Sequence, residues 1–269
     1  MKFISSRDNP LFKRLVRLSQ GRAEKVQTPQ GRAYRMVLEG EHLCRAWLDH
    51  QSQPELMIVS ESRAGQPPII QLAGRIEAER IVCFPDALFK SISNVENGQG
   101  VIFLAVAPQP VRPQRIIETS LWLDRIQDPG NVGTLLRTAA AAGIHHVYLA
   151  VGSAAAWSPK VLRSAQGAHF VLAVHEHIDL VAECEYLEIP LLATSLDNAV
   201  SLYDTQLPEQ AVWVVGHEGQ GVDPILQKKA QQRVFIPQVP QVESLNVGVA
   251  AGICLFEHRR QFMRQKPLQ

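Results

Sequence analysis

The sequence predicts an α/β protein whose larger, C-terminal part is built around a parallel sheet. From residue 121 onward, short strands rich in Val, Leu and Ile alternate with segments of helical pattern. Such strands are typical of parallel sheets that are covered on both faces. Three prolines within residues 107–113 separate this part from a first hundred residues in which helices and short strands mix. We therefore expect a second, smaller α/β domain at the N-terminus.

In the N-terminal part, Asn9 and Pro10 mark the start of a helix over residues 9–20, because proline fits the first helical turn. A second helix is expected over residues 41–49. Strands are predicted at residues 34–38, 56–60, 80–84 and 100–107. The proline-rich segment that follows has the composition of a semi-rigid linker. The expected boundaries are 1–107 for the N-terminal domain, 108–117 for the linker and 118–269 for the C-terminal domain.

The C-terminal part alternates regularly between strands and helices. Strands are predicted at residues 121–126, 146–151, 170–174, 190–195, 211–216 and 233–236. Helices are predicted at residues 132–142, 159–166, 177–187, 222–231 and 246–264. In a parallel sheet of this kind, ligands bind beyond the carboxyl ends of the strands. Polar residues at those ends are therefore the first candidates for a functional site.

Length and composition favour a globular protein of the cytoplasm. The chain has 269 residues, of which 46% are hydrophobic, which is enough for a sizeable core. No apolar run approaches the roughly 18–20 residues of a membrane-spanning helix and no signal peptide is recognisable, so we expect no membrane partner. The four cysteines form no Cys-x-x-Cys pair. We expect free, mostly buried thiols in a reducing compartment.

Charge is unevenly distributed, although the whole chain has a net charge of only +1. Residues 1–35 contain nine Lys or Arg and two acids, whereas the remainder has an excess of six acids. A basic segment of this kind is typical of contacts to nucleic-acid phosphates. The alternative is the solvated face of an amphipathic helix, since Leu11, Leu15 and Leu18 have helical spacing. The RNA-binding candidates selected in this segment are Arg7, Lys13, Arg14 and Arg17.

The first polar interruption in the C-terminal part lies at residues 128–137, where a strand leads into a helix. Asn131 is a good N-cap, and capping is the structural alternative to a functional role. Arg137 follows six positions later within an otherwise apolar helix. A buried arginine must be paired or employed in binding, although an isolated arginine is more often a surface residue.

The second interruption is a glycine-rich turn over residues 216–221. Gly216 and Gly221 permit positive φ and the close approach of a ligand, and Glu218 is the single carboxylate of the turn. The spacing matches neither the G-x-G-x-x-G of dinucleotide-binding proteins nor a phosphate loop. One fixed carboxylate suits a ligand that has amine or hydroxyl donors.

The third interruption spans residues 236–252, where a strand end passes through a loop into a helix of small apolar residues. Pro237 and Pro240 stiffen the loop, and Ser244 and Asn246 lie where the helix starts. Both can act as caps, but one cap is sufficient. A stiff polar loop at a helix N-terminus favours a ligand site.

Taken in this order, the three segments resemble the motifs of the SpoU/TrmH family of RNA ribose 2′-O-methyltransferases. Those motifs are Asn-x-Gly-x-x-x-Arg, Gly-Asn-Glu-Gly-x-Gly and Ser-Leu-Asn-Val-Ser-Val-Ala, and the resemblance covers residues 118–262. Through residues 5–11 and 38–40, the N-terminal part is more distantly similar to the L30e-like substrate-binding domain of many members. The chain departs from the family pattern at His217, where Asn is usual, and at Gly248, where Ser is usual.

The resemblance implies a SPOUT fold, in which the parallel α/β sheet ends in a C-terminal trefoil knot, and a homodimer with the site near the subunit interface. It also implies transfer of a methyl group from S-adenosylmethionine to a ribose 2′-hydroxyl of structured RNA. The implied catalytic and substrate-positioning residues are Asn131, Arg137, Glu218, Ser244 and Asn246. The expected cofactor-binding residues are Gly216, Ile236, Leu245, Gly221 and Ser195. Arg163 is a further RNA-binding candidate, with a surface helix as its alternative.

The chemistry of methyl transfer suggests a role for Arg137. A guanidinium keeps its proton and has no lone pair, so it is a poor general base. We expect Arg137 to hold the target phosphate as a fork and to stabilise the developing alkoxide, with Ser244 as a candidate for relaying the proton. Asn131, Glu218 and Asn246 would then orient Arg137 and the loops.

Several alternatives stay open at this point. A separate N-terminal domain favours ribosomal RNA of the 23S type over tRNA. A non-catalytic RNA-binding assembly factor would be expected to have lost Arg137 or Glu218, and a nicotinamide-dependent dehydrogenase would need a glycine fingerprint that is absent. We expect no metal site, because His175 and His177 have no third ligand nearby in the sequence. The target nucleotide, and a housekeeping or antibiotic-resistance role, are left open.

Overall fold

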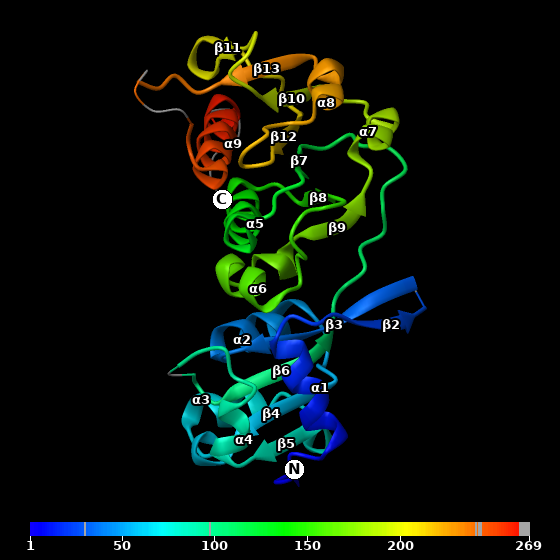
Figure 1. Cartoon of the computed structure of the whole chain (residues 1–269), viewed down its shortest axis with the longest axis vertical. Helices are drawn as coiled ribbons and strands as arrows, with labels where there is room; N and C mark the ends of the chain where they lie inside the picture. Colours follow the sequence, from blue (N-terminus) through cyan, green and yellow to red (C-terminus); the bar gives the residue numbers. More distant parts are fainter. Residues whose placement is uncertain (30, 97, 240, 242–243, 264–269) are drawn as a thin grey trace. The chain divides into compact units, whose positions relative to one another are not determined.

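The computed structural model describes residues 1–29, 31–96, 98–239, 241 and 244–263 (Figure 1). The chain folds into two compact units. Unit 1 consists of residues 1–109 and 157–170, and unit 2 consists of residues 110–156 and 171–269. The chain therefore leaves unit 2 after residue 156, contributes a helical segment to unit 1, and then returns.

Unit 1 contains a mixed sheet with the strand order β1-β5-β4-β6-β3-β2. Its strands are β1 (Lys2–Phe3), β2 (Glu24–Thr28), β3 (Gly31–Glu39), β4 (Leu56–Ser60), β5 (Ile81–Phe84) and β6 (Val101–Val106). β1, β5 and β4 are parallel, whereas β6, β3 and β2 are antiparallel to their neighbours. The sequence pattern does not predict β2, because this edge strand has a single apolar residue, Val26.

The described helices of unit 1 include the amphipathic helix that the leucine spacing predicts. They are α1 (Pro10–Ser19), α2 (Glu41–His50), α3 (Pro67–Ala73), α4 (Asp86–Lys90) and α6 (Pro159–Ala165), with 3-10 turns η1 (Glu61–Arg63), η2 (Ala78–Arg80) and η3 (Ala168–Val171). Asn9 caps α1 by accepting a hydrogen bond from the Leu11 N–H at 2.9 Å. Leu15 and Leu18 are buried in a core cluster with Phe84. The basic residues of α1 are therefore left toward solvent.

Unit 2 contains a sheet with the strand order β11-β13-β10-β12-β7-β8-β9. Its strands are β7 (Ser120–Asp124), β8 (His146–Ala150), β9 (Ala173–Ile178), β10 (Leu191–Thr194), β11 (Val200–Ser201), β12 (Val212–Gly216) and β13 (Gln232–Phe235). Every strand pair in this sheet is parallel. The predicted α/β class with a parallel sheet is confirmed, and the trefoil knot stays a prediction.

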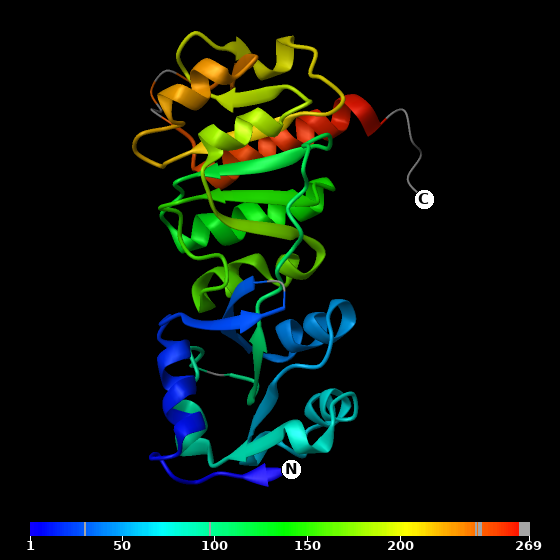
Figure 2. The same cartoon turned by 90° about the vertical axis from the view of Figure 1, so that its right-hand side faces the viewer.

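Helices cover both faces of the unit 2 sheet. They are α5 (Pro129–Ala142), α7 (Leu180–Glu183), α8 (Pro224–Lys229) and α9 (Val247–Met263), with 3-10 turns η4 (Cys184–Tyr186) and η5 (Leu202–Asp204). α5 packs against α9 on one face, and α7 and α8 lie on the other (Figures 1 and 2). Trp122 and Trp213 are fully buried within the sheet. Both faces of the sheet are thus covered, as the apolar strands predict.

One predicted helix of unit 2 is wrong in its extent. The pattern predicts a helix over residues 177–187, but β9 continues to Ile178 and is followed by the short helices α7 and η4. The Asp179 carboxylate accepts hydrogen bonds from the N–H groups of Val181 and Ala182, both at 3.1 Å. An N-cap aspartate terminates the strand and starts the helix at the next residue, so the helix cannot begin at 177.

Within the described ranges, no helix is both long and apolar enough to cross a membrane. Cys44, Cys83 and Cys254 are buried and Cys184 is half-buried, and all four are free thiols. Burial raises the pKa of Cys254 to about 12, so this thiol is uncharged and chemically quiet at neutral pH.

Candidate functional site

The three polar segments meet at the carboxyl ends of β7 and β12. These strands are neighbours in the sheet, and their last residues, Asp124 and Gly216, are register partners. The loop after β7 leads into α5, and the loop after β12 leads into α8. Because parallel strands end at the same edge, residues far apart in sequence are brought together there.

A chain of side-chain hydrogen bonds joins one residue from each segment. Asn131 Nδ2 donates to Glu218 Oε1 at 2.9 Å. Asn246 Nδ2 donates to Asn131 Oδ1, also at 2.9 Å. Asn246 Oδ1 in turn accepts from the N–H groups of Gly248 at 2.9 Å and Val249 at 3.3 Å. We call Glu218, Asn131 and Asn246 the amide relay.

The direction of the amide relay is determined at both ends. Ionised Glu218 can only accept, and the backbone N–H groups of α9 can only donate, so each asparagine amide has a single consistent orientation. Partial burial tends to raise the pKa of Glu218, but hydrogen bonds from Asn131 and from the N–H groups of Gln127 and Asp128 outweigh burial and lower this pKa. Glu218 is therefore a carboxylate at neutral pH, suited to positioning and unsuited to donating a proton.

The predicted capping role of Asn131 is wrong. α5 begins three residues earlier than predicted, and its N-cap is Asp128, whose Oδ1 accepts from the Asn131 N–H at 2.9 Å. Asp128 followed by Pro129 is itself a strong start signal for a helix. Because the backbone of Asn131 is capped by Asp128, its side chain is left for the amide relay.

Of the two caps predicted at the start of α9, Asn246 and Ser244, only Asn246 caps the helix in the described structure. The two backbone hydrogen bonds accepted by Asn246 are those of an N-cap. Ser244 is exposed, and its side chain makes no hydrogen bond to any residue that the structure describes. Pro240, the second proline expected to stiffen this loop, lies outside the described residues. Asn246 therefore combines capping with the amide relay, and the Ser244 hydroxyl faces solvent.

Arg137 does not lie where its apolar neighbours suggest. Its side chain is exposed and makes no ion pair or hydrogen bond with the described part of the chain. The expectation of a buried arginine is thus wrong, since the buried face of α5 is formed by Val132, Leu135, Leu136 and Ala139. Six helical positions correspond to about 600° of rotation, so Arg137 and Asn131 are on different sides of α5. Arg137 is therefore an exposed cation on the surface of α5, unpaired within the described residues.

The glycine-rich turn depends on Gly216. A Cβ atom at this position would lie 2.1 Å from Gly221 C and 2.1 Å from Val222 N. Backbone atoms cannot move aside as a side chain can, so only glycine fits. Gly221 has a φ of +70°, which also favours glycine. Both predicted cofactor-binding glycines therefore have a structural reason that is independent of any ligand.

His217 replaces the usual asparagine with an equivalent acceptor. Its Nδ1 accepts from the N–H of Gly219 at 3.0 Å and of Gln220 at 3.2 Å. An asparagine carbonyl makes the same kind of local turn contact. His217 is thus hydrogen-bonded within the turn that presents Glu218.

Gly248 is the second departure from the family pattern, and its neighbour on α5 explains it. A Cβ atom on Gly248 would lie 2.9 Å from Thr134 Cγ2 and 3.2 Å from Asn246 Oδ1. The methyl group of Thr134 thus fills the space that a serine side chain would need. This close packing holds the start of α9 against α5.

A second polar network, which the sequence did not single out, lies beside the amide relay. Asp124 is only 3% exposed, and its carboxylate accepts from Arg125 Nε at 2.9 Å and from the Asp223 N–H at 2.7 Å. Arg125 has a φ of 55° and also donates to Gln220 Oε1 at 3.3 Å. An aspartate ending an otherwise apolar strand was the available sequence signal. This network ties the β7 loop to the β12 loop.

The remaining expected cofactor-binding residues lie at the ends of neighbouring strands. Ile236 follows β13 and is half-buried, as is Leu245 before α9. Within the described residues, the backbone N–H and C=O groups of Ile236 and Leu245 make no hydrogen bonds. Ser195 follows β10, and its Oγ accepts from the Asp197 N–H at 3.1 Å. Apolar side chains beside backbone groups that are unpaired within the described residues fit the faces and the polar edge of the adenine of S-adenosylmethionine.

The basic candidates belong to unit 1 and differ in their partners. Lys13 pairs with Asp8 at 2.9 Å, and Arg14 pairs with Glu24 at 3.3 Å. Arg7 and Arg17 are exposed and make no ion pair with described residues. Arg163 donates to the Asn94 carbonyl at 2.9 Å, which anchors α6 within unit 1. Exposed pairs of this kind contribute little to stability and remain accessible to a phosphate.

Comparison with known proteins gives this site its context. Residues 118–256, just over half of the chain, match the SpoU rRNA Methylase family. The chain belongs to this family. This SpoU methylase is 35% identical to an uncharacterized tRNA/rRNA methyltransferase of Synechocystis, over 96% of this chain and 93% of the relative.

Two further matches support the same assignment. The 23S rRNA (guanosine(2553)-2′-O)-methyltransferase RlmP of Bacillus subtilis is 33% identical to this SpoU methylase, over 83% of this chain and 88% of the relative. The crystal structure of an AdoMet-bound rRNA methyltransferase from Sinorhizobium meliloti matches with a TM-score of 0.78 and 26% identity, over 96% of this chain and 97% of that one. The family predicted from the three motifs, and its enzyme class, are confirmed.

Proposed function

We propose that this protein transfers the methyl group of S-adenosylmethionine to a ribose 2′-hydroxyl of ribosomal RNA of the 23S type. As a SpoU methylase, the chain is an S-adenosylmethionine-dependent RNA methyltransferase. The observation that carries the proposal is the amide relay, whose hydrogen bonds join residues 87 and 115 positions apart. The name of the Bacillus subtilis relative supports a ribosomal substrate over tRNA.

The cofactor would be held at the carboxyl ends of the unit 2 strands. The backbone groups of Ile236 and Leu245, which make no hydrogen bond with described residues, suit the polar edge of adenine, and their side chains suit its faces. Gly216, Gly221 and Ser195 would line the same site from neighbouring strand ends. When bound, the cofactor supplies a methyl group activated by a positive sulfonium.

The residues of the chain would supply alignment and charge. The amide relay holds the loop of Glu218 and the start of α9 against α5, which is the kind of positioning that in-line displacement needs. Arg137 would hold the target phosphate and stabilise the developing alkoxide, while the exposed Ser244 hydroxyl would relay the 2′-hydroxyl proton. Arg137→Lys keeps the charge but loses the planar fork, so we expect turnover to fall by about 10-fold or more. Near-normal turnover of the lysine variant in a single-turnover assay would show that the fork is unimportant.

A homodimer would bring a second copy to the exposed surfaces of α5 and α9. Val249 and Phe256 on α9 are 52% and 48% exposed. They are seven residues apart and therefore lie along one stripe of the helix. Large exposed apolar side chains in such a stripe support an interface with another subunit. The monomer would then lack the environment in which Arg137 acts.

Unit 1 would bind the RNA outside the methyl-transfer site. We place the phosphate contacts at Arg7, Lys13, Arg14 and Arg17, with Arg163 as a further contact, and retain the L30e-like N-terminal domain and the boundaries 1–107, 108–117 and 118–269 as part of this proposal. The expected compartment is the cytoplasm, where the ribosomal substrate of a bacterial-type enzyme is found.

The proposal is tested by methyl transfer with the purified full-length protein. Radiolabelled S-adenosylmethionine is incubated with 23S rRNA and with tRNA, and ribose methylation is mapped in RNA from a strain that lacks the gene. We expect label in 23S rRNA, in alkali-resistant linkages, and one missing 2′-O-methyl group in the deletion strain. Label in tRNA alone would reassign the substrate, and cofactor binding without transfer to any RNA would favour an assembly factor.

A further inference from the structure

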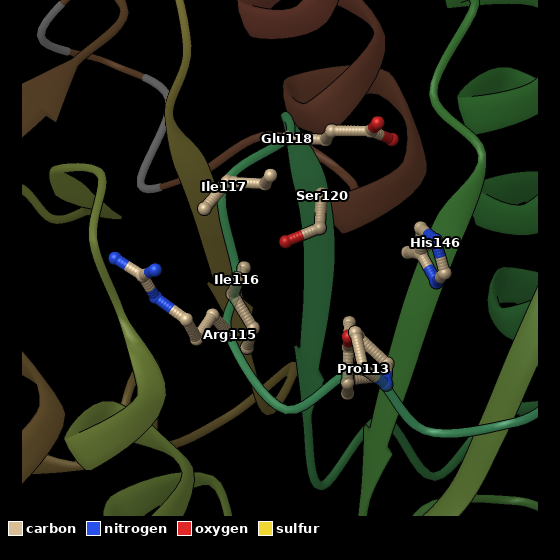
Figure 3. A pocket seen from close by; sticks show the side chains of 8 residues that line it. Pro113, Arg115, Ile116, Ile117, Glu118, Ser120 and His146 are labelled. Carbon is tan, nitrogen blue, oxygen red and sulfur yellow. The ribbon is translucent and has the colours of Figure 1, made fainter.

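A pocket lies at the amino ends of the unit 2 strands, whereas the amide relay lies at their carboxyl ends. A pocket of about 180 Å³ is lined by Pro113, Arg115, Ile116, Ile117, Glu118, Ser120, His146 and Tyr148. Figure 3 shows Ser120 and His146 on neighbouring strands, with the segment that carries Ile116 beside them. Ser120 and His146 are the first residues of β7 and β8, and they are register partners. β7 separates Ser120 from Asp124 by about 13 Å, at roughly 3.3 Å per residue.

Two buried hydroxyl groups beneath this pocket have no hydrogen-bond partner among the described residues. Ser120 and Tyr148 are both 0% exposed, and neither Ser120 Oγ nor Tyr148 OH forms a hydrogen bond with the described residues. Buried polar groups are normally paired, and an unpaired one costs about 1–3 kcal/mol. A single water needs only about 10–15 Å³, so the pocket is much larger than the space for one bridging water. The space above the two hydroxyls can therefore hold a molecule larger than water.

Two residues of the pocket lining, His146 and Tyr148, belong to a stack of uncharged aromatic rings. The rings of His146 and Tyr148 lie 28° from parallel, and His175 stacks on both, at 9° to His146 and 21° to Tyr148. Burial lowers the pKa of His175 to about 4, and burial together with His145 also lowers the pKa of His146. Burial raises the pKa of Tyr148 to about 12. The stack is thus neutral at pH 7. Of its three rings, the half-buried His146 is the one with accessible surface in the pocket, because Tyr148 is 0% exposed and His175 does not line it.

The segment of residues 115–117 forms another side of the pocket and is fixed by hydrogen bonds. Ile116 N donates to the Tyr186 carbonyl at 2.8 Å, and the Glu188 N–H donates to the Ile116 carbonyl at 3.1 Å. Arg115 forms an ion pair with Glu188, so residues 115–116 are tied to residues 186–188 at several points. The pocket is therefore preformed, which reduces the entropy lost when a ligand binds. Arg115 and Glu118 at the rim have opposite charges, so the pocket selects neither an anion nor a cation.

The geometry points to a binding site for an unpaired nucleobase of RNA, stacked on the half-buried His146 ring above the buried hydroxyls of Ser120 and Tyr148. A nucleobase is planar and uncharged, and its edge has the donors and acceptors that the Ser120 and Tyr148 hydroxyls lack. Bases splayed from single-stranded RNA are commonly held by aromatic stacking, worth about 1–3 kcal/mol per base. Base binding here is measured without methyl transfer, so it can fail or succeed independently of the proposed function.

The site is tested by saturation-transfer NMR on the full-length protein. Guanosine, adenosine, cytidine and uridine are each added in the presence of saturating S-adenosylhomocysteine, which blocks the cofactor site. We expect transfer to at least one base, and an affinity about 5- to 100-fold weaker in the double variant Ser120→Ala/Tyr148→Phe, since each lost hydrogen bond contributes about 0.5–1.5 kcal/mol. The matched control, Ser91→Ala/Tyr203→Phe, removes the same groups elsewhere and should bind normally.

A second arm identifies the source of the base. RNA that contains 4-thiouridine is cross-linked to the protein, and the attached peptides are identified by mass spectrometry. Cross-links to residues 113–120 or 146–148 that disappear in the double variant support an RNA base, whereas nucleoside binding without such cross-links would overturn the RNA source. No transfer to any nucleoside, or equal transfer to the double variant, would overturn the site. Removal of unpaired hydroxyls should leave folding intact, and the single variant Ser120→Ala serves if the double variant is unstable.

Discussion

The carboxyl ends and the amino ends of the unit 2 strands, here called the carboxyl edge and the amino edge, differ in how their polar side chains are paired. At the carboxyl edge, Glu218, Asn131 and Asn246 satisfy one another and the backbone of α9. At the amino edge, the hydroxyls of Ser120 and Tyr148 are buried without partners in the described structure. Both edges lie on the same strands, since β7 begins with Ser120 and ends with Asp124.

Paired and unpaired polar groups contribute differently to the stability of the fold. A closed set of hydrogen bonds holds loops in one arrangement, so breaking it should disorder the site at a high cost. An open set contributes nothing to the fold until another molecule completes it, so removing it should cost the fold little. Variants at the two edges should therefore differ in sign as well as in size.

The largest effect is expected for Gly216→Ala at the carboxyl edge. The added methyl group would overlap the backbone of Gly221 and Val222, so the turn must rearrange and Glu218 must move. We expect methyl transfer to fall by at least about 100-fold and the free energy of unfolding to fall by about 1–3 kcal/mol or more. Gly219→Ala is the matched control, because its nearest neighbours lie 3.8 Å away. Equal activity of the two variants would contradict the close approach.

The next effect is expected for Asn131→Asp, which places a carboxylate against Glu218. The donor at 2.9 Å becomes a like charge, while the acceptor for Asn246 is kept. We expect activity to fall by about 10- to 100-fold, from the loss of one charge-assisted hydrogen bond and the added repulsion. When Glu218→Gln is added, the new amide at position 218 can donate to the new carboxylate at position 131. The hydrogen bond is then restored in the reverse direction, so part of the lost activity should be recovered. Purely additive losses in this double-mutant cycle would show that the two residues do not interact.

At the amino edge, His175 should make stability depend on pH. Its folded pKa is about 4, against about 6.5 when unfolded, because burial, His146, Arg112 and His145 disfavour its charged form. Between these values the unfolded chain binds more protons, so the free energy of unfolding falls as pH falls from 6.5 to 4, by at most about 3 kcal/mol. His175→Phe keeps a stacked ring and should lose this part of the pH dependence in urea titrations. His50→Asn, at an exposed histidine, should keep it; identical pH profiles for wild type and His175→Phe would refute the assignment.

The smallest effect is expected for the unpaired hydroxyls in the absence of ligand. Ser120→Ala and Tyr148→Phe should each change the free energy of unfolding by between zero and a gain of about 1 kcal/mol, because no hydrogen bond is lost. Denaturant titration of the free protein measures this directly. A loss above about 1 kcal/mol would mean that the hydroxyls are satisfied within the chain, and the contrast between the two edges would disappear.

Much of the architecture follows from local pattern in the sequence. Apolar runs such as residues 121–124 and 212–215 specify buried parallel strands, and their regular alternation with helices specifies the α/β class. The three motifs identify Asn131, Glu218 and Asn246 as members of one site because their order and spacing are specific in combination. Asp128 followed by Pro129 is likewise a local start signal, so the N-cap of α5 is contained in the sequence.

Other features depend on partners that are distant in the chain. Asp124 is held by the backbone of Asp223, 99 positions away, and α6 packs with unit 1 although its sequence lies between strands of unit 2. The exposure of Arg137 was missed because apolar neighbours in sequence do not show which side of a helix faces the core. These are pairings between elements, which single-sequence periodicity does not contain.

The sequence by itself determined the class of fold, the family and the residues that converge at the carboxyl edge. Those properties depend on local hydrophobic period and on motif spacing. The tertiary structure alone decided the direction of the amide relay, the solvent exposure of Arg137 and the pocket beside Ser120 and Tyr148. Each of these depends on which strands and helices become neighbours, and that choice is made by packing across the whole sheet.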